Sequence, residues 1–231
     1  MADRPYTLLS CGMSIDGYLD SAKVKRLPLS NEADFDRVDA VRAECDAIMV
    51  GAATVRNDNP RLLVRAAARR EQRRARGRCP SPIKVTVTAG GGGLDADANF
   101  FTTGDVEKIV YCASPALDRV KENLSDVATV VDAGEPVRMQ EVTEDLYQRG
   151  VRRLMVEGGG TLHTQFLTAD LADELQLVIA PFFVGDSRAR RFVDDGRFPW
   201  NAHRRATLAE VRQIGDVVLL RYALSSRFGV R

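Results

Sequence analysis

Short apolar runs bounded by glycine or polar residues recur along the chain and predict the strands of a buried sheet. They occur at residues 6–13, 46–51, 83–88, 107–112, 127–131 and 152–158. Helical stretches lie between several of them, at residues 32–45, 115–124, 137–149 and 161–169. Because strands alternate with helices, we expect an α/β fold with a mostly parallel sheet and helices on both of its faces.

The helix predicted at residues 32–45 has an approximate period of apolar side chains, and Ser30 or Asn31 precedes it as a candidate N-cap. A period of this kind predicts that one side of the helix packs against the sheet. The side chains that we expect on this side are Phe35, Val38, Val41 and Ala43.

The end of the chain has a different pattern. Residues 206–214 and 217–224 are strand-like and flank a Gly215-Asp216 turn, which predicts an antiparallel hairpin at one edge of the sheet. No linker rich in proline, glycine or serine divides the chain, so we expect residues 1–231 to form a single domain.

Composition and charge narrow the class of protein. Apolar residues make up 45% of the chain and charged residues 28%, which is ordinary for a globular protein. The 33 basic and 32 acidic residues give a net charge of +1, which argues against nucleic acid or a membrane surface as the main partner. Since the chain lacks a long apolar run and the pattern of a signal peptide, we expect neither a transmembrane helix nor secretion.

The four cysteines do not indicate a metal site. They form no CxxC pair and no cluster with histidine, so we expect no structural zinc. Isolated cysteines beside apolar strands are usually buried thiols, and free thiols suit a reducing, cytoplasmic environment. The residues are Cys11, Cys45, Cys79 and Cys112.

The stretch VEGGGTLHTQFL, residues 156–167, places three glycines between a predicted strand and a predicted helix. Backbone N–H groups at a helix N-terminus lack intrahelical acceptors and lie at the positive end of the helix dipole. Glycines there let a phosphate approach the backbone closely, so one interpretation is a phosphate site, and the other is a tight turn without a ligand. Glu157 either accepts hydrogen bonds from a base or only favours the helix dipole.

A second polar stretch, GAATVRNDNPRLLVR at residues 51–65, begins at the end of a predicted strand. It offers a hydroxyl, a carboxylate, an apolar wall and a cation, from Thr54, Asp58, Leu62 and Arg65. This mixture suits a polar, phosphorylated heterocycle. The alternative is a proline-containing connection with an Asx turn at Asp58. A third stretch, CGMSIDGYLD at residues 11–20, adds a hydroxyl and flexible backbone after the first strand.

Two further segments are compositionally unusual. Residues 65–78 hold seven arginines in fourteen positions, which indicates either a solvated helix or loop between sheet elements or a site for a phosphate-bearing ligand. Residues 88–101 carry four glycines after a predicted strand, and a loop of this kind could contact a cofactor. His163 and His203 are not paired by spacing, and His163 either contacts a phosphate or has a packing role.

Several catalytic signatures are absent from the chain. It has no GxSxG, HExxH or Cys–His arrangement, so we do not expect nucleophilic hydrolysis. The glycine spacing is not the GxGxxG of a dinucleotide-binding Rossmann fold. The zinc-ligand signature of nucleobase deaminases is missing as well.

Taken together, the motifs resemble the riboflavin-pathway pyrimidine reductases. The pieces that carry the resemblance are MSIDGY, VRAECDAIMVGAATVRNDNPRLLVR, MVEGGGTLHTQFL and LADELQLVIAPFFVG, within roughly residues 6–224. That family comprises the C-terminal half of bacterial bifunctional deaminase–reductases and stand-alone archaeal and fungal enzymes. The resemblance implies a dihydrofolate-reductase-like three-layer sandwich, with a mostly parallel central sheet and a C-terminal antiparallel hairpin, and it implies a homodimer.

The resemblance also implies a reaction. With NADPH as cofactor, such enzymes reduce the ribosyl group of a ribosylaminopyrimidine 5′-phosphate to the ribitylamino product, as 5-amino-6-(5-phosphoribosylamino)uracil reductases do. Because the deaminase signature is missing, we expect a reductase alone. Hydride delivery to an imine carbon needs positioning rather than a protein nucleophile. The nitrogen must be protonated, and Asp58 or a water that it holds could support this step.

The resemblance assigns roles to individual residues. The catalytic residue would be Asp58. The cofactor would be bound by Gly12, Thr54, Asp58, Gly159, Gly160, Thr161, Leu162, His163, Thr164 and Gln165. The substrate would be bound by Arg42, Leu62, Arg65 and Glu157.

Other functions remain open from the sequence. One is a reductase of the same fold that acts on a pterin or dihydrofolate, or on a pyrimidine of secondary metabolism. Another is a nucleotide-binding protein without catalysis, although the presence of both Asp58 and Glu157 argues against it. The choice between the 2,5-diamino and the deaminated pyrimidine is also open.

Overall fold

The computed structural model describes residues 3–21 and 27–229, which form two compact units. The first unit is made of Met1–Pro5 and Asp39–Met155, and the second of Tyr6–Val38 and Val156–Arg231. Each unit has strands with helices packed on them, as the alternating pattern of the sequence predicts.

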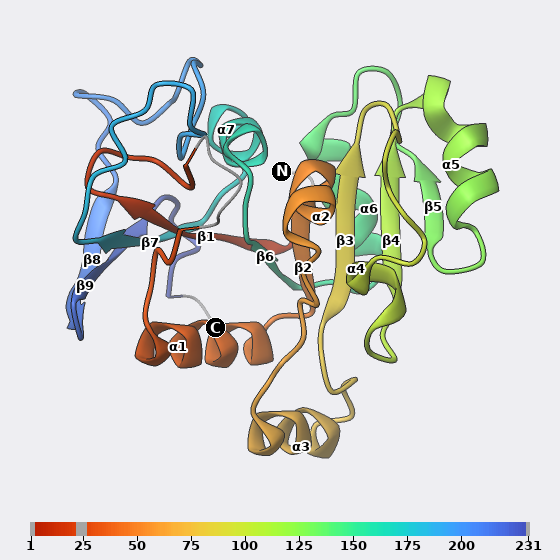
Figure 1. The fold of residues 1–231 in the computed structure, drawn as a ribbon, viewed down its shortest axis with the longest axis horizontal. Helices are drawn as coiled ribbons and strands as arrows, with labels where there is room; N and C mark the ends of the chain where they lie inside the picture. Colours follow the sequence, from red (N-terminus) through yellow and green to blue (C-terminus); the bar gives the residue numbers. More distant parts are fainter. Residues whose placement is uncertain (1–2, 22–26, 230–231) are drawn as a thin grey trace. The chain divides into compact units, whose positions relative to one another are not determined.

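The first unit contains a parallel set of strands in the order β5-β4-β3-β2, with β6 next to β2 (Figure 1). Their bounds are β2 Ala47–Gly51, β3 Ile83–Thr88, β4 Lys108–Cys112, β5 Thr129–Asp132 and β6 Arg153–Val156. The pairs β2–β3, β3–β4 and β4–β5 are parallel, so the carboxyl ends of these four strands lie at one edge. Apolar residues fill β2 and β4 because both strands are almost entirely buried.

Helices flank these strands. They are α2 Ala52–Asp58, α3 Ala67–Ala75, α4 Asn99–Thr102, the 3₁₀ turn η1 Ser114–Ala116, α5 Leu117–Leu124 and α6 Met139–Gln148. Figure 1 shows α2 in front of β2 and β3, α6 behind the strands, and α5 beside β5. The connection expected after β2 is therefore helical in its first half. The helix α2 ends at Asn59, whose left-handed φ of 43° stops it.

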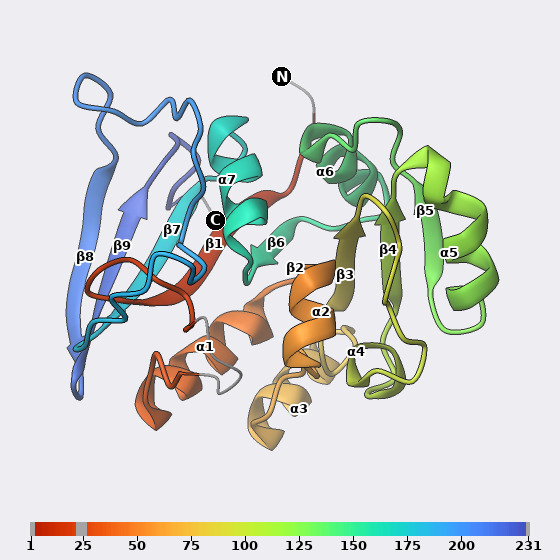
Figure 2. The ribbon, with the colours of Figure 1, turned by 45° about the horizontal axis from the view of Figure 1, so that its top comes forward.

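The second unit contains the strand order β1-β7-β9-β8 (Figure 2). The bounds are β1 Tyr6–Ser14, β7 Glu174–Ala180, β8 Thr207–Ile214 and β9 Val217–Ala223. β1 and β7 are parallel, whereas β9 is antiparallel to both β7 and β8. The predicted hairpin is confirmed, because Ile214 pairs with Val217 across the turn and Gly215 takes the φ of 62° that the turn needs.

Two helices accompany the strands of the second unit. α7 spans Gly160–Thr168, and α1 spans Glu32–Glu44, of which the first half belongs to this unit. Figures 1 and 2 show α7 and α1 on opposite sides of β1 and β7. Among the helices of the described residues, none has the length and apolar character that crossing a membrane requires.

The packing side of α1 is polar, which corrects one prediction. Asn31 is the N-cap, since its Oδ1 accepts the N–H of Asp34 at 3.1 Å. Phe35, expected in the core, is 40% exposed. Arg37 faces the sheet instead and donates to Asp34 at 2.6 Å and to Gln176 of β7 at 2.6 Å. The apolar period failed here because this face of β7 carries buried polar side chains that need polar partners.

The cysteines only partly follow the prediction of buried thiols. Cys45 and Cys112 are buried, and Cys11 is partly buried. Burial raises the pKa of the Cys11 thiol, which makes it a poor nucleophile. Cys79 is exposed, so the prediction was wrong for this residue. It lies in the connection after α3, where no strand covers it.

Candidate functional site

The end of β2 leads directly into α2 and sets the position of Thr54 and Asp58. These two residues are four positions apart on α2 and therefore lie on one face of the helix. Both are half-buried, so a hydroxyl and a carboxylate stand side by side near the carboxyl ends of the parallel strands. Asp58 is the last residue of α2, and the chain turns at Asn59.

The segment that follows α2 carries Leu62 and Arg65. Leu62 is buried and has a φ of 49°, a left-handed conformation that costs a bulky residue on the order of 1–2 kcal/mol. Such a conformation persists only where the surroundings require it, and it is typical of binding sites. The side chain of Arg65 is 56% exposed, and its Nε lies 3.9 Å from the Asp39 carboxylate.

Arg42 lies close to the same segment. It is half-buried on α1, and its Nη1 donates to the carbonyl of Leu63 at 3.4 Å. Three of the four predicted substrate residues, Arg42, Leu62 and Arg65, thus belong to one local assembly in the first unit. An apolar side chain and two guanidinium groups within one assembly suit a heterocycle that carries an anionic group.

In the second unit, the three glycines at the start of α7 have different structural roles. Gly158 and Gly159 have φ values of 139° and 95°, which other residues rarely adopt. Gly158 is buried, and a Cβ on it would have no atom within 4 Å, so its φ rather than a close contact requires glycine. A Cβ on Gly160 would collide with the backbone carbonyl of Arg191. The tight turn therefore explains Gly158 and Gly159, and packing against Arg191 explains Gly160.

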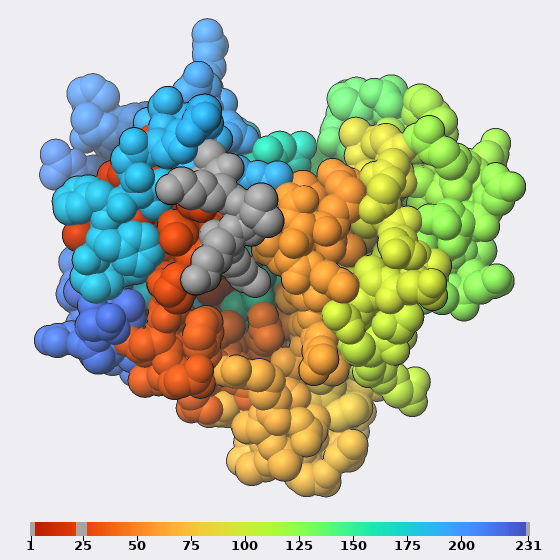
Figure 3. Space-filling view, viewed as in Figure 1, coloured from red at the N-terminus to blue at the C-terminus, as the bar shows by residue number. Residues whose placement is uncertain are grey.

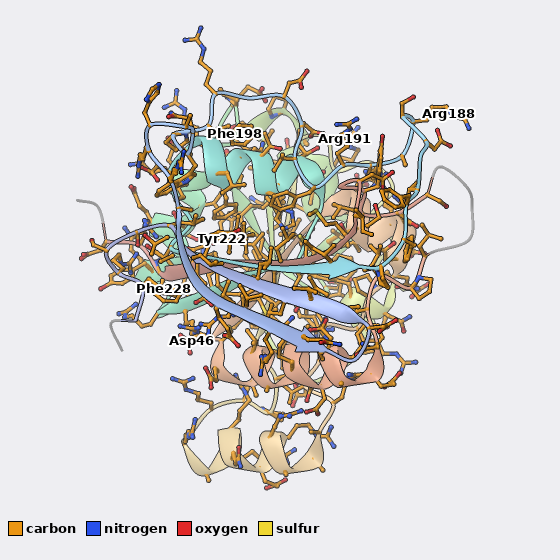
Figure 4. The ribbon with its side chains drawn as sticks, turned by 90° about the vertical axis from the view of Figure 1, so that its left-hand side faces the viewer. Asp46, Arg188, Arg191, Phe198, Tyr222 and Phe228 are labelled. Atoms are coloured by element: carbon orange, nitrogen blue, oxygen red, sulfur yellow. The ribbon has the colours of Figure 1, made fainter. Side chains whose placement is uncertain are left out.

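The side chains of α7 divide into a surface group and a core group. Thr161 and Gln165 are exposed and Thr164 is half-buried, so these three predicted cofactor residues are near the surface. The Thr161 hydroxyl donates to the Asp194 carboxylate at 3.0 Å, and the Asp194 N–H donates to the Thr164 hydroxyl at 2.8 Å. Figure 4 shows Arg191, from the same loop, beside α7.

The other two side chains, Leu162 and His163, point into the core. His163 is fully buried, and its ring lies 5.3 Å from that of Phe192. Burial lowers the pKa of His163 to about 4, although the backbone of Phe192 and Val156 acts against this. Neither ring nitrogen makes a well-aligned hydrogen bond among the described residues. The imidazole is therefore neutral at pH 7. Of the two roles considered from the sequence, phosphate contact and packing, its burial favours packing.

Glu157 and Gly12 are the remaining predicted site residues. Glu157 is half-buried, follows β6 directly and precedes the buried Gly158. Gly12 lies in β1 opposite Val178 of β7. A Cβ on Gly12 would lie 3.1 Å from the carbonyl oxygen of Leu29, so close packing with Leu29 explains this glycine without a ligand.

The polar groups after β1 connect parts of the second unit. The Asp16 carboxylate accepts the Ser14 hydroxyl at 2.6 Å, the Val184 N–H at 3.0 Å and the Gly185 N–H at 2.8 Å. Burial opposes the charged form, but these hydrogen bonds outweigh it and lower the pKa of Asp16 to about 2. Ser14 and Asp16 are therefore structural residues.

The arginine-rich stretch includes α3, which lies on the surface in Figure 3. Arg73 is nevertheless buried and donates to the carbonyls of Ala43, Cys45 and Cys79 at 2.7–2.8 Å. Arg69 donates to Asp39 at 2.9 Å. These arginines hold α3 against the end of α1, so the stretch is more than a solvated insertion.

One polar group at the carboxyl edge was missed from the sequence. The Ser114 hydroxyl donates at 2.7 Å to Asp132, the last residue of β5, and this bond lowers the pKa of Asp132. The glycine-rich loop after β3 lies at the same edge, where Arg56 donates to the Gly92 carbonyl at 3.1 Å. The sequence could have indicated Asp132 by its position, because it directly follows a predicted strand and ligands bind at the carboxyl ends of parallel strands.

Comparisons with known proteins identify the family. The model of the RibD C-terminal domain matches residues 5–220. The chain is 33% identical over 226 residues to 2,5-diamino-6-ribosylamino-4(3H)-pyrimidinone 5′-phosphate reductase of Archaeoglobus fulgidus, which covers 97% of this chain and 99% of that protein. It is 35% identical to the protein of the same name from Methanothermobacter thermautotrophicus, over 83% of this chain and 84% of the relative.

Solved structures show the same fold. A pyrimidine reductase-like protein from Corynebacterium diphtheriae superposes with a TM-score of 0.81 at 23% identity, covering 95% of this chain and 91% of that one. RibD of Acinetobacter baumannii superposes with a TM-score of 0.76 at 22% identity, covering 95% and 58%. The predicted dihydrofolate-reductase-like fold is confirmed. The chain therefore belongs to the RibD C-terminal domain family, the riboflavin-pathway pyrimidine reductases, which use a nicotinamide cofactor.

Proposed function

We propose that the protein reduces the ribosyl group of 2,5-diamino-6-ribosylamino-4(3H)-pyrimidinone 5′-phosphate to the ribitylamino product, with NADPH as the reductant. Relatives with this name are 32–35% identical to the chain, whereas the bifunctional RibD proteins are 25–30% identical. The observation that carries the proposal is local. One face of α2 presents Thr54 and Asp58, and the strained Leu62 and the exposed Arg65 follow directly.

The residues before and within α7 suit a dinucleotide cofactor. Gly158 and Gly159 bring the chain into α7 without side chains, and the first-turn N–H groups of α7 favour an anion. The Asp194 carboxylate disfavours a phosphate at the Thr161 hydroxyl, so we assign phosphate binding to the backbone rather than to that side chain. Thr164 and Gln165 would border this site through α7, and the cofactor supplies the hydride when bound.

In this proposal the protein positions the imine carbon of the substrate and supplies a proton. The cofactor would supply a hydride to that carbon, and Asp58, directly or through a water, would deliver a proton to the adjacent nitrogen. Thr54, one helical turn before Asp58, would hold the nicotinamide amide by hydrogen bonding. Arg65 and Arg42 bind the 5′-phosphate and the other polar groups, Leu62 packs on the ring, and Glu157 accepts hydrogen bonds from the pyrimidine edge.

The test is an assay of the purified protein for loss of reduced-nicotinamide absorbance. We expect turnover of the diamino pyrimidine with NADPH, with kcat/KM at least about tenfold above that for the deaminated pyrimidine. Turnover of dihydrofolate alone would replace the proposal with a pterin reductase. Binding of NADPH without turnover of any pyrimidine would support a non-catalytic protein.

We also propose that the protein is a homodimer. β8 and β9, at the front of Figure 4 with Tyr222 labelled, have one apolar face. On this face Leu208 is 51%, Val211 59% and Val218 37% exposed. Leu208 pairs with Tyr222, and Val211 with Leu220, so these side chains form one continuous surface. An apolar sheet face of this kind is typical of a protein interface, and a second copy offers the same surface in return.

The oligomeric state tests this surface. Val211→Lys places a charge at its centre and should convert the dimer to a monomer in light scattering coupled to size exclusion. Arg212→Lys on the same strand, whose side chain lies on the other face, is the matched control. A wild-type protein that is monomeric at micromolar concentration contradicts the proposal.

The extent of the active unit is part of the same proposal. The family match runs through both compact units without interruption, so we infer that residues 1–231 act as one reductase domain. The free thiols suit a reducing compartment, which supports a cytoplasmic location. Limited proteolysis with and without NADPH would test the first inference, since one domain should be protected as a whole.

A further inference from the structure

The segment Leu62–Ala66 has neither helix nor strand, yet side chains from elsewhere in the first unit bind its backbone. The hydroxyl of Ser81 accepts the N–H of Val64 at 3.0 Å. Arg70 of α3 donates to the carbonyl of Val64 at 3.2 Å and also to that of Arg65. Because this segment lies in neither a helix nor a sheet, side chains supply hydrogen-bond partners for its backbone.

Asp39 accepts two N–H groups of this segment. Its carboxylate accepts the N–H of Arg65 at 2.5 Å and the N–H of Ala66 at 3.1 Å. It also accepts the guanidinium of Arg69 at 2.9 Å. Asp39 is only 2% exposed, and a buried carboxylate is tolerated because these donors replace water.

Asp39 also fixes the residues that lead into α3. α3 begins after Ala66, whose side chain cannot accept the N–H groups of the first helical turn. The two N–H groups that Asp39 accepts belong to Arg65 and Ala66, the residues immediately before α3. The chain that enters α3 is therefore fixed to α1 through Asp39.

These contacts lie beside the strained residue of the segment. Leu62, with its φ of 49°, precedes the bonded residues, and strain of this kind persists only where neighbouring bonds enforce it. Arg42, three positions after Asp39 on α1, donates to the carbonyl of Leu63. One turn of α1 therefore holds both ends of the segment, with Arg42 near Leu62 and Asp39 at Arg65.

We propose that Asp39, together with Arg70, is a positioning residue that directs the Arg65 guanidinium toward the phosphate of the substrate. This rests on the proposed function, in which Arg65 binds that phosphate. It also gives the arginine-rich stretch a role, because Arg69 and Arg70 complete the set of contacts around Asp39 and Arg65. The backbone of Arg65 is held by these bonds, and its Nε lies 3.9 Å from the Asp39 carboxylate. An arginine whose backbone is held in this way loses less conformational freedom when it binds, which favours affinity for the substrate.

A double-mutant cycle tests the proposal. Asp39→Asn should raise the KM for the pyrimidine phosphate by about tenfold, while kcat and the KM for NADPH change little. In an Arg65→Ala background, Asp39→Asn should have no further effect on the KM for the pyrimidine. Additive effects, or an equal rise in the KM for NADPH, would show that Asp39 only stabilises the fold. The matched control is Asp126→Asn, an exposed aspartate of the same unit.

A second measurement does not depend on turnover. Ribose 5-phosphate is a probe for the phosphate subsite, and its affinity can be measured by calorimetry even if no pyrimidine is reduced. Asp39→Asn and Arg65→Ala should weaken its binding to the same extent, and unchanged binding in Asp39→Asn would overturn the proposal. A wild-type protein that binds ribose 5-phosphate but reduces no pyrimidine contradicts only the proposed function.

If Asp39→Asn does not fold, Arg70→Gln is a second variant that tests the proposal. It removes the donor to the Val64 and Arg65 carbonyls and should also weaken ribose 5-phosphate binding. Arg76→Gln, an exposed arginine just after α3, is the matched control and should bind as the wild type does. Equal binding by Arg70→Gln and Arg76→Gln would contradict the role of Arg70. Faster hydrogen exchange at the Arg65 amide should accompany Asp39→Asn, because that variant changes the acceptor of this N–H.

Discussion

A Cβ on Gly160 would lie nearer than 3.0 Å to the backbone carbonyl oxygen of Arg191, a separation that real Cβ atoms do not show. The obstacle is backbone rather than the end of a flexible side chain, so α7 or the segment at Arg191 would have to move. Packing within the second unit therefore requires Gly160, whereas the conformation of the turn requires Gly158 and Gly159.

Gly160→Ala should consequently destabilise the protein. Overpacking of this kind costs about 1–3 kcal/mol, and the shift would also displace the start of α7. Chemical denaturation measures the loss in the free energy of unfolding. Gly92→Ala is the control, because a Cβ there meets no atom within 4 Å and the stability should stay near that of the wild type. Equal stability of the two variants would contradict this account.

Asp58→Asn should lower kcat for the pyrimidine on the order of 10²-fold or more, since it removes the group that supports protonation. The amide has nearly the same shape, so the KM for NADPH should change much less. Steady-state kinetics at saturating cofactor measures both values. The comparison variant is Asp97→Asn, at an exposed position of the glycine-rich connection, which should keep the wild-type kcat. If kcat survives in Asp58→Asn, another group supplies the proton.

Glu157→Gln should change substrate choice rather than only rate. A carboxylate accepts hydrogen bonds from two donors of a pyrimidine edge, whereas an amide presents one acceptor and one donor. We expect kcat/KM to fall more for the diamino pyrimidine than for the deaminated one, which replaces an amino group by a carbonyl. Assays of both substrates with each protein give the ratio. An unchanged ratio would remove Glu157 from pyrimidine recognition.

Because of Lys84, we expect the free energy of unfolding to depend on pH in the alkaline range. It is fully buried in β3, and its Nζ donates to the carbonyls of Phe100 at 2.9 Å and Thr103 at 2.6 Å. Burial, with repulsion from Lys108, lowers its pKa from 10.5 to about 8. Between these two pH values the unfolded chain binds more protons than the folded one, so the free energy of unfolding rises with pH across this window.

Lys84→Met removes this dependence. The stability of the wild type relative to Lys84→Met should increase from pH 8 to pH 10.5, by an amount on the order of 1 kcal/mol or more. Urea denaturation at a series of pH values measures the difference between the two proteins. A difference that stays constant over this range would mean that Lys84 titrates normally in the folded state.

Most strands were readable from local sequence because each is a short apolar run with a polar or glycine boundary. β7 is also mostly buried, but it was not among the predicted strands. β1, β3 and the β8–β9 hairpin lie within one residue of the predicted ends. α2 was not predicted as a helix, since seven residues with Asn57, Asp58 and Pro60 nearby give almost no periodic signal. Its helical form depends on packing against β2 and β3, which no local pattern reports.

For the candidate site residues, the sequence showed their identities but not their burial or their partners. Family motifs located Thr54, Asp58, Leu62, Arg65 and Glu157, because these residue types and their order are written in the chain. Exposure was not readable, so His163 stood among the cofactor contacts although its ring is buried. Asp39 was not singled out at all, since its partners Arg65, Ala66 and Arg69 are 26 or more positions away.

The sequence by itself determined the alternation of strands and helices, the C-terminal hairpin and the family, because these depend on local periodicity, turn residues and motif order. Only the tertiary structure decided which polar side chains are buried and what they bind. Phe35 is at the surface and Arg37 is against the sheet because β7 presents polar partners there. Likewise, Gly160 is required by Arg191, and the Arg65 backbone is held by Asp39, since both depend on contacts between segments that are distant in the chain.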